Sequence, residues 1–281
     1  MSIDSPIGIF DSGLGGLTVA KRVLEKLPHE SIVYVGDEIH IPYGEKPPEE
    51  IRSFALGITD FLIRRNSKLI IMACNMSSAT ALQPARQLFP NVPVIGVIEA
   101  GARAAVRTAS EGAIGVIATT GTVSTEAYTK TLQKLLPDAN VIEQACPRFV
   151  PLVEAGMSDS LEAETAAREY VEPLLNASCR TIILGCTHYP FLTDAIKKAA
   201  GLQVTLVDPA EETAIEAANI LFEVGKLNPQ DAEPIHAYFT SDRPERFAEL
   251  GSQFLGSMIY GVQQITWGQQ ASEKTLSAII Y

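Results

Sequence analysis

Short runs of apolar, often β-branched residues recur along the chain, and each is separated from the next by a longer segment of helical character. Strand, helix and strand at this spacing are typical of βαβ units, which build parallel sheets. The runs are continuously apolar rather than alternating with polar residues, as expected for strands that are covered on both faces. The sequence therefore predicts an α/β protein. The expected strands cover residues 6–10, 31–35, 69–73, 92–97, 113–118, 140–143, 181–184 and 203–207.

One of the expected helices carries clear signals at both ends. Asp208 can cap its N-terminus, Pro209 suits the first helical position, and Glu211 places an acid in the first turn. An amphipathic run then continues to Val224, and Gly225 follows as a stop signal. We expect a helix over residues 209–224.

An internal repeat divides the chain into two copies of one unit. Three pairs of segments resemble each other in the same order and at nearly equal separations, so we expect two similar α/β units joined near Ala100. Apolar hexamers of an α/β protein can look alike without duplication, but the shared order argues against that alternative. The pairs are residues 7–12 with 114–119, 70–75 with 182–187, and, more faintly, 94–100 with 204–210.

Composition limits the functional classes. The formal net charge of −11 argues against a nucleic-acid groove, which needs clustered Lys and Arg. The apolar runs are far shorter than a membrane span, and no basic region followed by an apolar stretch opens the chain, so we expect a cytoplasmic protein without a membrane partner. The 4 cysteines form no C-x-x-C pair and no Cys/His zinc spacing, so we expect free thiols and no metal.

Two of these cysteines occupy matching positions in the repeat. Cys74 and Cys186 each follow an expected parallel strand, at the edge where open α/β sheets bind ligands. A helix start follows each thiol, and its partial positive charge favours the thiolate. His188 lies two residues after Cys186 and can relay a proton. A lone cysteine is more often a core residue, but the matched pair indicates two acid/base groups that face each other across a cleft.

A racemisation or epimerisation needs two such groups, because one base removes a proton from carbon and the opposite acid returns one to the other face. No context for a pyridoxal lysine is evident, so we expect no cofactor and stabilisation by hydrogen-bond donors. Taken alone, Asp11 reads as a turn residue and Glu154 as a solvated acid, while Cys146 and Cys179 read as inert. Polar groups at the strand ends supply the expected donors: Ser12, Tyr43, Gly44, Asn75, Thr119, Thr122 and Thr187.

Five spaced motifs resemble the cofactor-independent glutamate racemases, and the resemblance runs from about Ile7 to Leu255. Five motifs in order are far more specific than any one of them. They are GIFDSGLGGLTV at 8–19, GDEIHIPYGEK at 36–46, ACNMSSATAL at 73–82, CPRFVPLVEAG at 146–156 and GCTHYPFL at 185–192. The segment YFTSDRPERFAELGSQFLG at 238–256 also resembles the family's C-terminal part.

The resemblance implies two similar three-layer α/β domains with mostly parallel sheets, related by pseudo-twofold symmetry, with the active site in the cleft between them. The first domain would comprise residues 1–98 plus about 211–281, and the second would comprise residues 99–210. The resemblance further implies that Asp11 tunes Cys74, and that Glu154 and His188 tune Cys186. Its implied glutamate contacts are Ser12, Tyr43, Gly44, Asn75, Met76, Thr119, Thr122 and Thr187.

The family supplies D-glutamate for peptidoglycan, uses no cofactor and is often dimeric, so the resemblance also implies a possible homodimer. Met76 departs from the pattern, because the family usually has a threonine at this position. That departure is the only support for aspartate or another amino acid as the substrate, and His188 favours the glutamate branch. Two further alternatives are a catalytically silent two-lobed binding protein and a redox dithiol, which would need the sulfurs close enough to bond.

Overall fold

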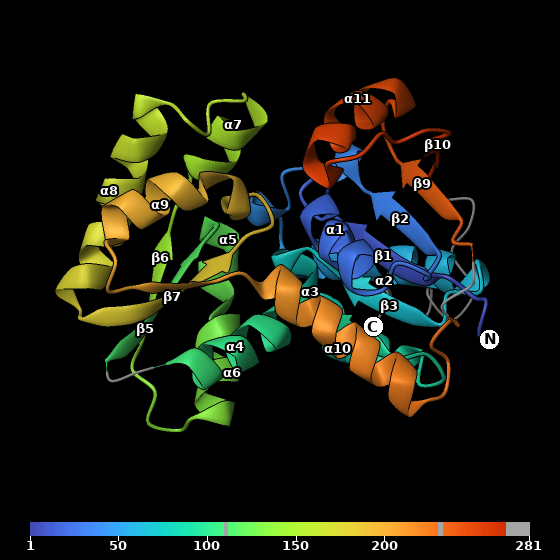
Figure 1. Cartoon of the computed structure of the whole chain (residues 1–281), viewed down its shortest axis with the longest axis horizontal. Helices are drawn as coiled ribbons and strands as arrows, with labels where there is room; N and C mark the ends of the chain where they lie inside the picture. The colour runs from blue at the N-terminus through green and yellow to red at the C-terminus, as the bar shows by residue number, and fades with distance from the viewer. Residues whose placement is uncertain (110–111, 230–232, 268–281) are drawn as a thin grey trace. The chain divides into compact units, whose positions relative to one another are not determined.

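The computed structural model describes residues 1–109, 112–229 and 233–267. The chain forms two compact units (Figure 1). Unit 1 comprises Met1–Val97 and the chain from Thr213 onward, and unit 2 comprises Ile98–Glu212. The first unit is therefore built from two separate stretches of chain.

Unit 1 contains a parallel six-stranded sheet in the order β10-β9-β2-β1-β3-β4. The strands β1, β2 and β3 are completely buried, which explains their continuously apolar sequences. Phe10, Val35, Phe61, Met72 and Phe239 belong to the core on one face of this sheet. The strands are β1 (Ile7–Asp11), β2 (Ile32–Gly36), β3 (Leu69–Met72), β4 (Val94–Gly96), β9 (His236–Thr240) and β10 (Gln263–Gln264).

The helices of unit 1 connect and cover these strands (Figure 1). Most begin and end where the sequence places a signal. Pro48 and two acidic residues open α2, and Arg64 closes it, an arrangement that suits the helix dipole. The helices are α1 (Leu17–Lys26), α2 (Pro48–Arg64), α3 (Asn75–Leu88), α10 (Pro209–Glu223), most of which lies in this unit, and α11 (Pro244–Leu255).

Unit 2 contains a parallel four-stranded sheet in the order β6-β5-β7-β8. Its strands are β5 (Ala113–Ala118), β6 (Val141–Ala145), β7 (Cys179–Gly185) and β8 (Thr205–Val207). Its helices are α4 (Val97–Thr108), α5 (Thr120–Thr125), α6 (Ala127–Leu135), α7 (Phe149–Glu154), α8 (Leu161–Asn176) and α9 (Thr193–Ala200). Short 3-10 helices also occur at Glu38–His40 and Tyr43–Glu45 in unit 1, and at Tyr189–Leu192 in unit 2.

The two sheets share one strand order. Strands β2-β1-β3-β4 of unit 1 correspond, one by one, to β6-β5-β7-β8 of unit 2. The repeated segments of the sequence fall on equivalent strands. Residues 7–12 contain β1, and residues 114–119 contain most of β5. Residues 70–75 contain most of β3, and residues 182–187 contain the carboxyl end of β7. The α/β class and the mostly parallel sheets expected from the sequence are confirmed.

The helix expected over residues 209–224 is confirmed as α10, which spans Pro209–Glu223. The side chain of Asp208 accepts a hydrogen bond from the backbone N–H of Ala210 at 3.0 Å, and Gly225 adopts a φ of 65° just beyond the helix. Strands β9 and β10 were not among the strands expected from the sequence.

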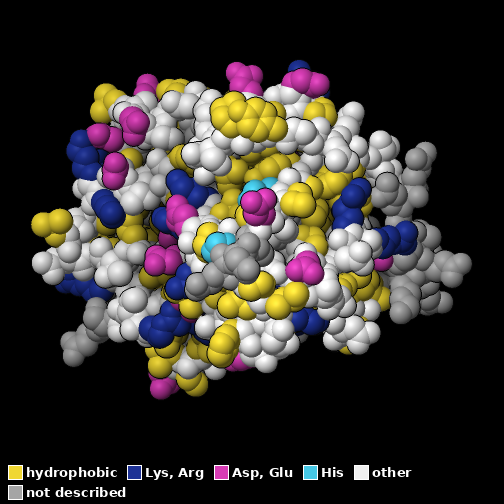
Figure 2. Space-filling view, turned by 45° about the vertical axis from the view of Figure 1, so that its right-hand side comes forward, with side chains coloured by type: hydrophobic (Ala, Val, Ile, Leu, Met, Phe, Trp, Pro, Cys, Tyr) yellow, Lys and Arg dark blue, Asp and Glu magenta, His cyan; other side chains and the backbone are white. Residues whose placement is uncertain are grey.

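Among the described residues, no helix combines the length and the apolar character that crossing a membrane requires. On the face drawn in Figure 2, Lys and Arg side chains are dispersed between acidic and apolar ones. The chain as a whole has more Asp and Glu than Lys and Arg, with a formal net charge of −11.

Candidate active site

The two candidate thiols stand at equivalent places in their units. Cys74 lies just beyond β3 and directly precedes α3, and Cys186 lies just beyond β7. In each unit the strand that ends at the thiol pairs with the first strand of the repeat, β1 or β5. Residues at the carboxyl ends of these neighbouring parallel strands therefore gather at one edge of each sheet.

In unit 1, this arrangement places Asp11 beside Cys74. Asp11 is the last residue of β1, and the backbone N–H of Ala73 donates to the carbonyl oxygen of Phe10 at 2.9 Å. Asp11 is buried, and its Oδ2 accepts a hydrogen bond from the backbone N–H of Gly13 at 3.0 Å. A Cβ at Gly16 would lie only 2.4 Å from the Cβ of Asp11, so the turn can pass here only with glycine.

The environment of Cys74 keeps it protonated. Burial raises the pKa of the Cys74 thiol to about 12, and the nearby Asp11 carboxylate adds to this shift. The backbone N–H and the hydroxyl of Ser77, together with the hydroxyl of Ser12, act in the opposite direction because they favour the thiolate. Cys74 is thus a neutral acid at neutral pH, with groups beside it that can stabilise the charged form.

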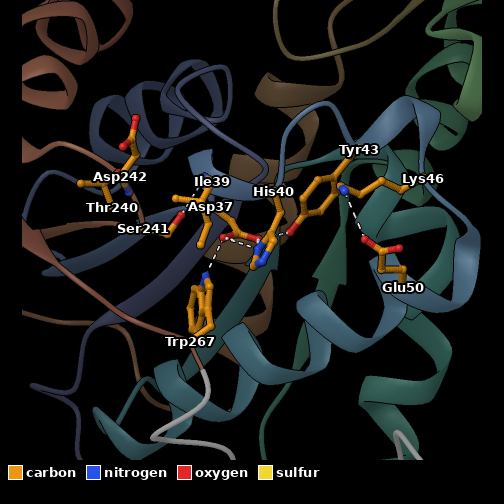
Figure 3. Close-up of polar contacts among 10 residues, drawn as sticks. All are labelled: Asp37, Ile39, His40, Tyr43, Lys46, Glu50, Thr240, Ser241, Asp242 and Trp267. Atoms are coloured by element: carbon orange, nitrogen blue, oxygen red, sulfur yellow. Dashed lines mark hydrogen bonds and ion pairs between the residues drawn. The ribbon is translucent and has the colours of Figure 1, made fainter.

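Tyr43 forms the apolar wall next to this thiol. Its ring lies in a buried cluster with Ile51, Cys74 and Met76. Its hydroxyl donates a 2.6 Å hydrogen bond to Oδ2 of Asp37 (Figure 3). Burial, and then the Asp37 carboxylate, raise the pKa of Tyr43 well above 10, so it remains a phenol at neutral pH.

Three further predicted contacts accompany Tyr43 in unit 1. Gly44 follows it in the short helix Tyr43–Glu45. Asn75 and Met76 are the first two residues of α3, and both are buried. The structure therefore brings Ser12, Tyr43 and Met76 to the surroundings of Cys74, through their contacts with the thiol or with its cluster.

In unit 2, a histidine and a carboxylate stand in line with Cys186. Cys186 is half-buried, and its Sγ lies 3.8 Å from Nδ1 of His188. On the other side of the imidazole, Nε2 lies 3.4 Å from Oε1 of Glu154, at the end of α7. An imidazole between a thiol and a carboxylate can take the thiol proton while the carboxylate stabilises the imidazolium.

The structure also explains why glycine precedes Cys186. A Cβ at Gly185 would lie 2.8 Å from the carbonyl oxygen of Ile117 on the neighbouring strand and 3.1 Å from the ring of Tyr128. The strand end can therefore approach β5 closely only without a side chain. This close approach fixes the position from which Cys186 projects.

Thr119 and Thr122 lie at the neighbouring strand end. Ala118 pairs with Gly185, so Thr119 and Cys186 both directly follow paired residues. The hydroxyl of Thr119 caps α5 by accepting from the backbone N–H of Thr122 at 3.4 Å, and the two hydroxyls are 3.1 Å apart. Thr187 lies between Cys186 and His188. These three threonines supply hydroxyl groups at the same edge as the thiol.

The two remaining cysteines are buried, and one of them, Cys146, interacts electrostatically with Cys186. Cys146 and Cys179 are buried free thiols, and burial raises the pKa of each. In the part of the chain that the structure describes, no group of three or more His, Cys, Asp or Glu side chains could hold a metal ion. The predicted site residues thus form two sets, one at the carboxyl edge of each sheet.

Sequence reasoning missed Asp37, a buried carboxylate that contacts the predicted set. It directly follows β2 and accepts the hydroxyl of Tyr43. Its position after an apolar strand is the same signal that pointed to Ser12 and Cys74. The rule could have found it, but its hydrogen-bond partners could not be predicted, because one of them, Trp267, is 230 residues away in the chain.

Known proteins are similar to this chain in both sequence and fold. A model of the Asp/Glu/hydantoin racemase family matches residues 15–217. A glutamate racemase of Geobacter metallireducens is 45% identical over 260 residues, which are 92% of this chain and 96% of that protein. A glutamate racemase of Corynebacterium diphtheriae is 44% identical over 261 residues, which are 93% of this chain and 98% of that protein.

Solved structures agree with these sequence relatives. The glutamate racemase RacE1 of Bacillus anthracis superimposes with a TM-score of 0.89 and 39% identity, over 94% of this chain and 98% of that one. The glutamate racemase of Francisella tularensis, solved in complex with D-glutamate, superimposes with a TM-score of 0.88 and 35% identity over the same shares. With the family model matching most of its length and relatives above 40% identity, the chain belongs to the Asp/Glu/hydantoin racemase family and is an isomerase.

Proposed function

We propose that this protein is a glutamate racemase, which interconverts L- and D-glutamate by proton transfer at Cα between Cys74 and Cys186. The observation that carries the proposal is the placement of the two thiols after equivalent strands, β3 and β7, of a duplicated sheet. Equivalent strands offer equivalent acid/base groups, which is what a reaction that runs in both directions across one carbon needs. The relatives named glutamate racemase support the choice of substrate.

In each turnover the atoms balance without a redox partner. One cysteine, as the thiolate, takes the Cα proton and becomes a thiol, which leaves the electron pair on the substrate as a carbanion. The other cysteine, as the thiol, gives its proton to the opposite face of the carbon and becomes a thiolate. No cofactor is needed, and preorganised hydrogen-bond donors must stabilise the developing charge.

The two thiols are served by different neighbours. In unit 2, His188 accepts the proton of Cys186 and Glu154 holds the resulting imidazolium, so this thiol can be converted to the base. In unit 1, burial and then the Asp11 carboxylate raise the pKa of Cys74 and keep it protonated, which suits the role of acid. When the reaction runs the other way, Cys74 must become the thiolate, and Ser12 and Ser77 are the groups that favour it.

The substrate carboxylates would be held by neutral donors, since the chain carries an excess of acidic residues. Hydroxyl and backbone N–H groups can bind carboxylates in the absence of a cationic clamp. Those proposed for this task are Ser12, Gly44, Asn75, Met76, Thr119, Thr122 and Thr187, together with the backbone N–H of Tyr43, whose hydroxyl already donates to Asp37.

The decisive experiment is incubation with L-glutamate in D₂O. D-glutamate that carries deuterium at Cα should form, because the returned proton comes from a thiol that exchanges with solvent. The absence of both product and exchange at Cα would contradict the proposal. Ligand binding without exchange would identify a silent binding protein instead.

Aspartate is the second candidate substrate, and Met76 favours it by departing from the family's threonine. A panel of L-amino acids, compared by kcat/KM, separates the two candidates. Glutamate should lead, and a higher value for aspartate would reverse the assignment.

We further propose that the product supplies peptidoglycan synthesis in the cytoplasm and that the enzyme acts as a homodimer. Rescue of a D-glutamate auxotroph by the expressed chain tests the first point. The mass in solution, measured by light scattering, tests the second.

A further inference from the structure

A buried carboxylate of unit 1 accepts hydrogen bonds from three side chains, one of which is the candidate site residue Tyr43. Asp37, directly after β2, is completely buried. Its Oδ2 accepts from the hydroxyl of Tyr43 at 2.6 Å and from Nδ1 of His40 at 2.8 Å, and its Oδ1 accepts from Nε1 of Trp267 at 2.6 Å (Figure 3). We call Asp37, His40, Tyr43 and Trp267 the Asp37 hub.

This donor set satisfies a group that is costly to bury. An ionised carboxylate away from water needs hydrogen bonds to both of its oxygens, and bonds to a charged acceptor are stronger than neutral ones. Because the carboxylate can only accept, each partner must point its hydrogen at Asp37. Loss of one donor leaves a lone pair of a buried charge unsatisfied, which costs more than an ordinary surface hydrogen bond.

The hub is joined to the candidate site at two points. The ring of Tyr43 packs with Cys74 and Met76, and the backbone N–H of Asp37 donates to the carbonyl oxygen of Asp11 at 3.1 Å. Phe54 packs against two members of the hub. The His40 ring stacks on it with 3.9 Å between the centroids, and the centroid of the Tyr43 ring lies 5.9 Å from that of Phe54. A displacement of Asp37 would therefore reach the surroundings of both Cys74 and Asp11.

Trp267 comes to this hub from the far end of the chain. The backbone N–H of Ile265, just after β10, donates to the carbonyl oxygen of Thr240 at 2.8 Å, which ties this part of the chain to β9. The ring of Trp267 meets the ring of Phe61 edge to face, with 6.2 Å between the centroids. The indole is thus fixed by apolar contacts, and its N–H bonds to Asp37.

We propose that Asp37 is a positioning residue for the glutamate site, that it orients Tyr43 against Cys74, and that Trp267 and His40 hold Asp37 in place. Both stretches of chain that build unit 1 then determine affinity for glutamate. The second stretch contributes Trp267, which is not a member of the thiol cluster. This inference rests on the proposed function for the identity of the substrate. Since Tyr43 gives its hydrogen to Asp37, its oxygen meets the substrate as an acceptor only.

The test is a double-mutant cycle between Trp267→Phe and Tyr43→Phe. Trp267→Phe keeps an aromatic ring for Phe61, although a smaller one, and removes the N–H that donates to Asp37. His40→Phe, as a second donor variant, keeps the stack on Phe54 and removes the ring N–H. Thr59→Val serves as the matched control, because it removes another buried hydrogen bond of unit 1, the 2.7 Å bond from the Thr59 hydroxyl to the carbonyl oxygen of Ala55.

We expect Trp267→Phe and His40→Phe each to raise KM for glutamate about tenfold, as the loss of a hydrogen bond to a buried charge implies. The kcat should change less than about threefold, because we expect the oriented Tyr43 to contribute equally to binding of the substrate and of the transition state. In the Tyr43→Phe background the same substitutions should no longer raise KM, since the hydroxyl that Asp37 holds is absent. Thr59→Val should leave KM unchanged.

Three results of the KM measurements would overturn the inference. They are an unchanged KM in both donor variants, a KM effect of equal size in the Tyr43→Phe background, and a KM effect of the same size in Thr59→Val. The free energy of unfolding, measured by urea denaturation for the same cycle, needs no substrate. If the changes in the free energy of unfolding are additive, Trp267 and Tyr43 are not linked through Asp37, and the inference is wrong. If instead the wild-type protein fails to racemise glutamate, only the proposed function is contradicted.

Discussion

Cys74 and Cys186 stand after equivalent strands of equivalent sheets, yet they differ in burial and in the groups beside the sulfur. Cys74 is buried beside a carboxylate, and its raised pKa keeps the proton on sulfur. Cys186 is half-buried beside an imidazole that a carboxylate supports from the other side. The two half-sites share one framework of strands, but the groups that favour or oppose loss of the thiol proton differ between them.

This asymmetry has a thermodynamic limit. L- and D-glutamate have the same free energy in water, so the equilibrium constant of racemisation is fixed by the substrate and not by the protein. The ratio of kcat/KM in the two directions must therefore be unity, however different the two thiols are. The difference between the half-sites can appear only in how each direction divides into kcat and KM, and in variants that disable one half.

The largest effect should come from removing either thiol. Cys74→Ala and Cys186→Ala should each lower racemisation at least about a thousandfold, because each removes the acid or base on one face. Each variant should still exchange the Cα proton of one enantiomer in D₂O without inverting it, and the two variants should act on opposite enantiomers. NMR of both enantiomers measures this. Exchange of the same enantiomer by both variants would break the assignment of one thiol to each face.

The neighbours should matter next. His188→Asn and Asp11→Asn should each lower kcat about a hundredfold, within the range of a group that assists proton transfer. Glu154→Gln should cost less, since Glu154 is half exposed and acts on Cys186 through His188. Initial rates from L- and from D-glutamate, followed by circular dichroism, should show that the two substitutions divide differently between kcat and KM. Identical profiles for both would mean that the half-sites are not chemically distinct.

Alkylation should separate the two thiols by about tenfold or more in rate at pH 8, because only the thiolate reacts and Cys74 is both buried and protonated. Its pKa of about 12 means that the thiolate fraction of Cys74 grows roughly tenfold for each unit of pH between 8 and 11, so its labelling should accelerate in that range. Mass spectrometry after iodoacetamide treatment reports each site, and buried Cys146 and Cys179 serve as internal references. Faster labelling of Cys74 than of Cys186 would reverse the comparison.

The smallest effect concerns the residue two positions after each thiol, which is Met76 in one half and His188 in the other. Met76 packs with Tyr43 and Cys74, and its side chain carries no hydrogen-bond donor. Met76→Thr restores a hydroxyl, so KM for glutamate should fall about three- to tenfold, as expected for one added hydrogen bond of about 1 kcal/mol. Met76→Leu is the control that keeps the apolar volume. Equal KM values in the two variants would show that the hydroxyl is not used.

The sequence predicts the repeated framework well because its signals are local. Each buried strand is a continuous apolar run, and each thiol marks a strand end, so the central strands and both cysteines can be located without coordinates. Strand β9 begins with an exposed histidine and β10 is only two residues long, so neither carries a long apolar run. The contact from Trp267 to Asp37 depends on how distant segments pack, and no local pattern encodes it.

Trp267 is the sole tryptophan of the chain, and its indole N–H is bonded to the carboxylate that also holds Tyr43. Indole emission responds to the charge and polarity around the ring, so the native protein carries its own optical reporter of this region. Titration with glutamate can then be followed by intrinsic fluorescence, without an attached dye and without turnover in an inactive cysteine variant.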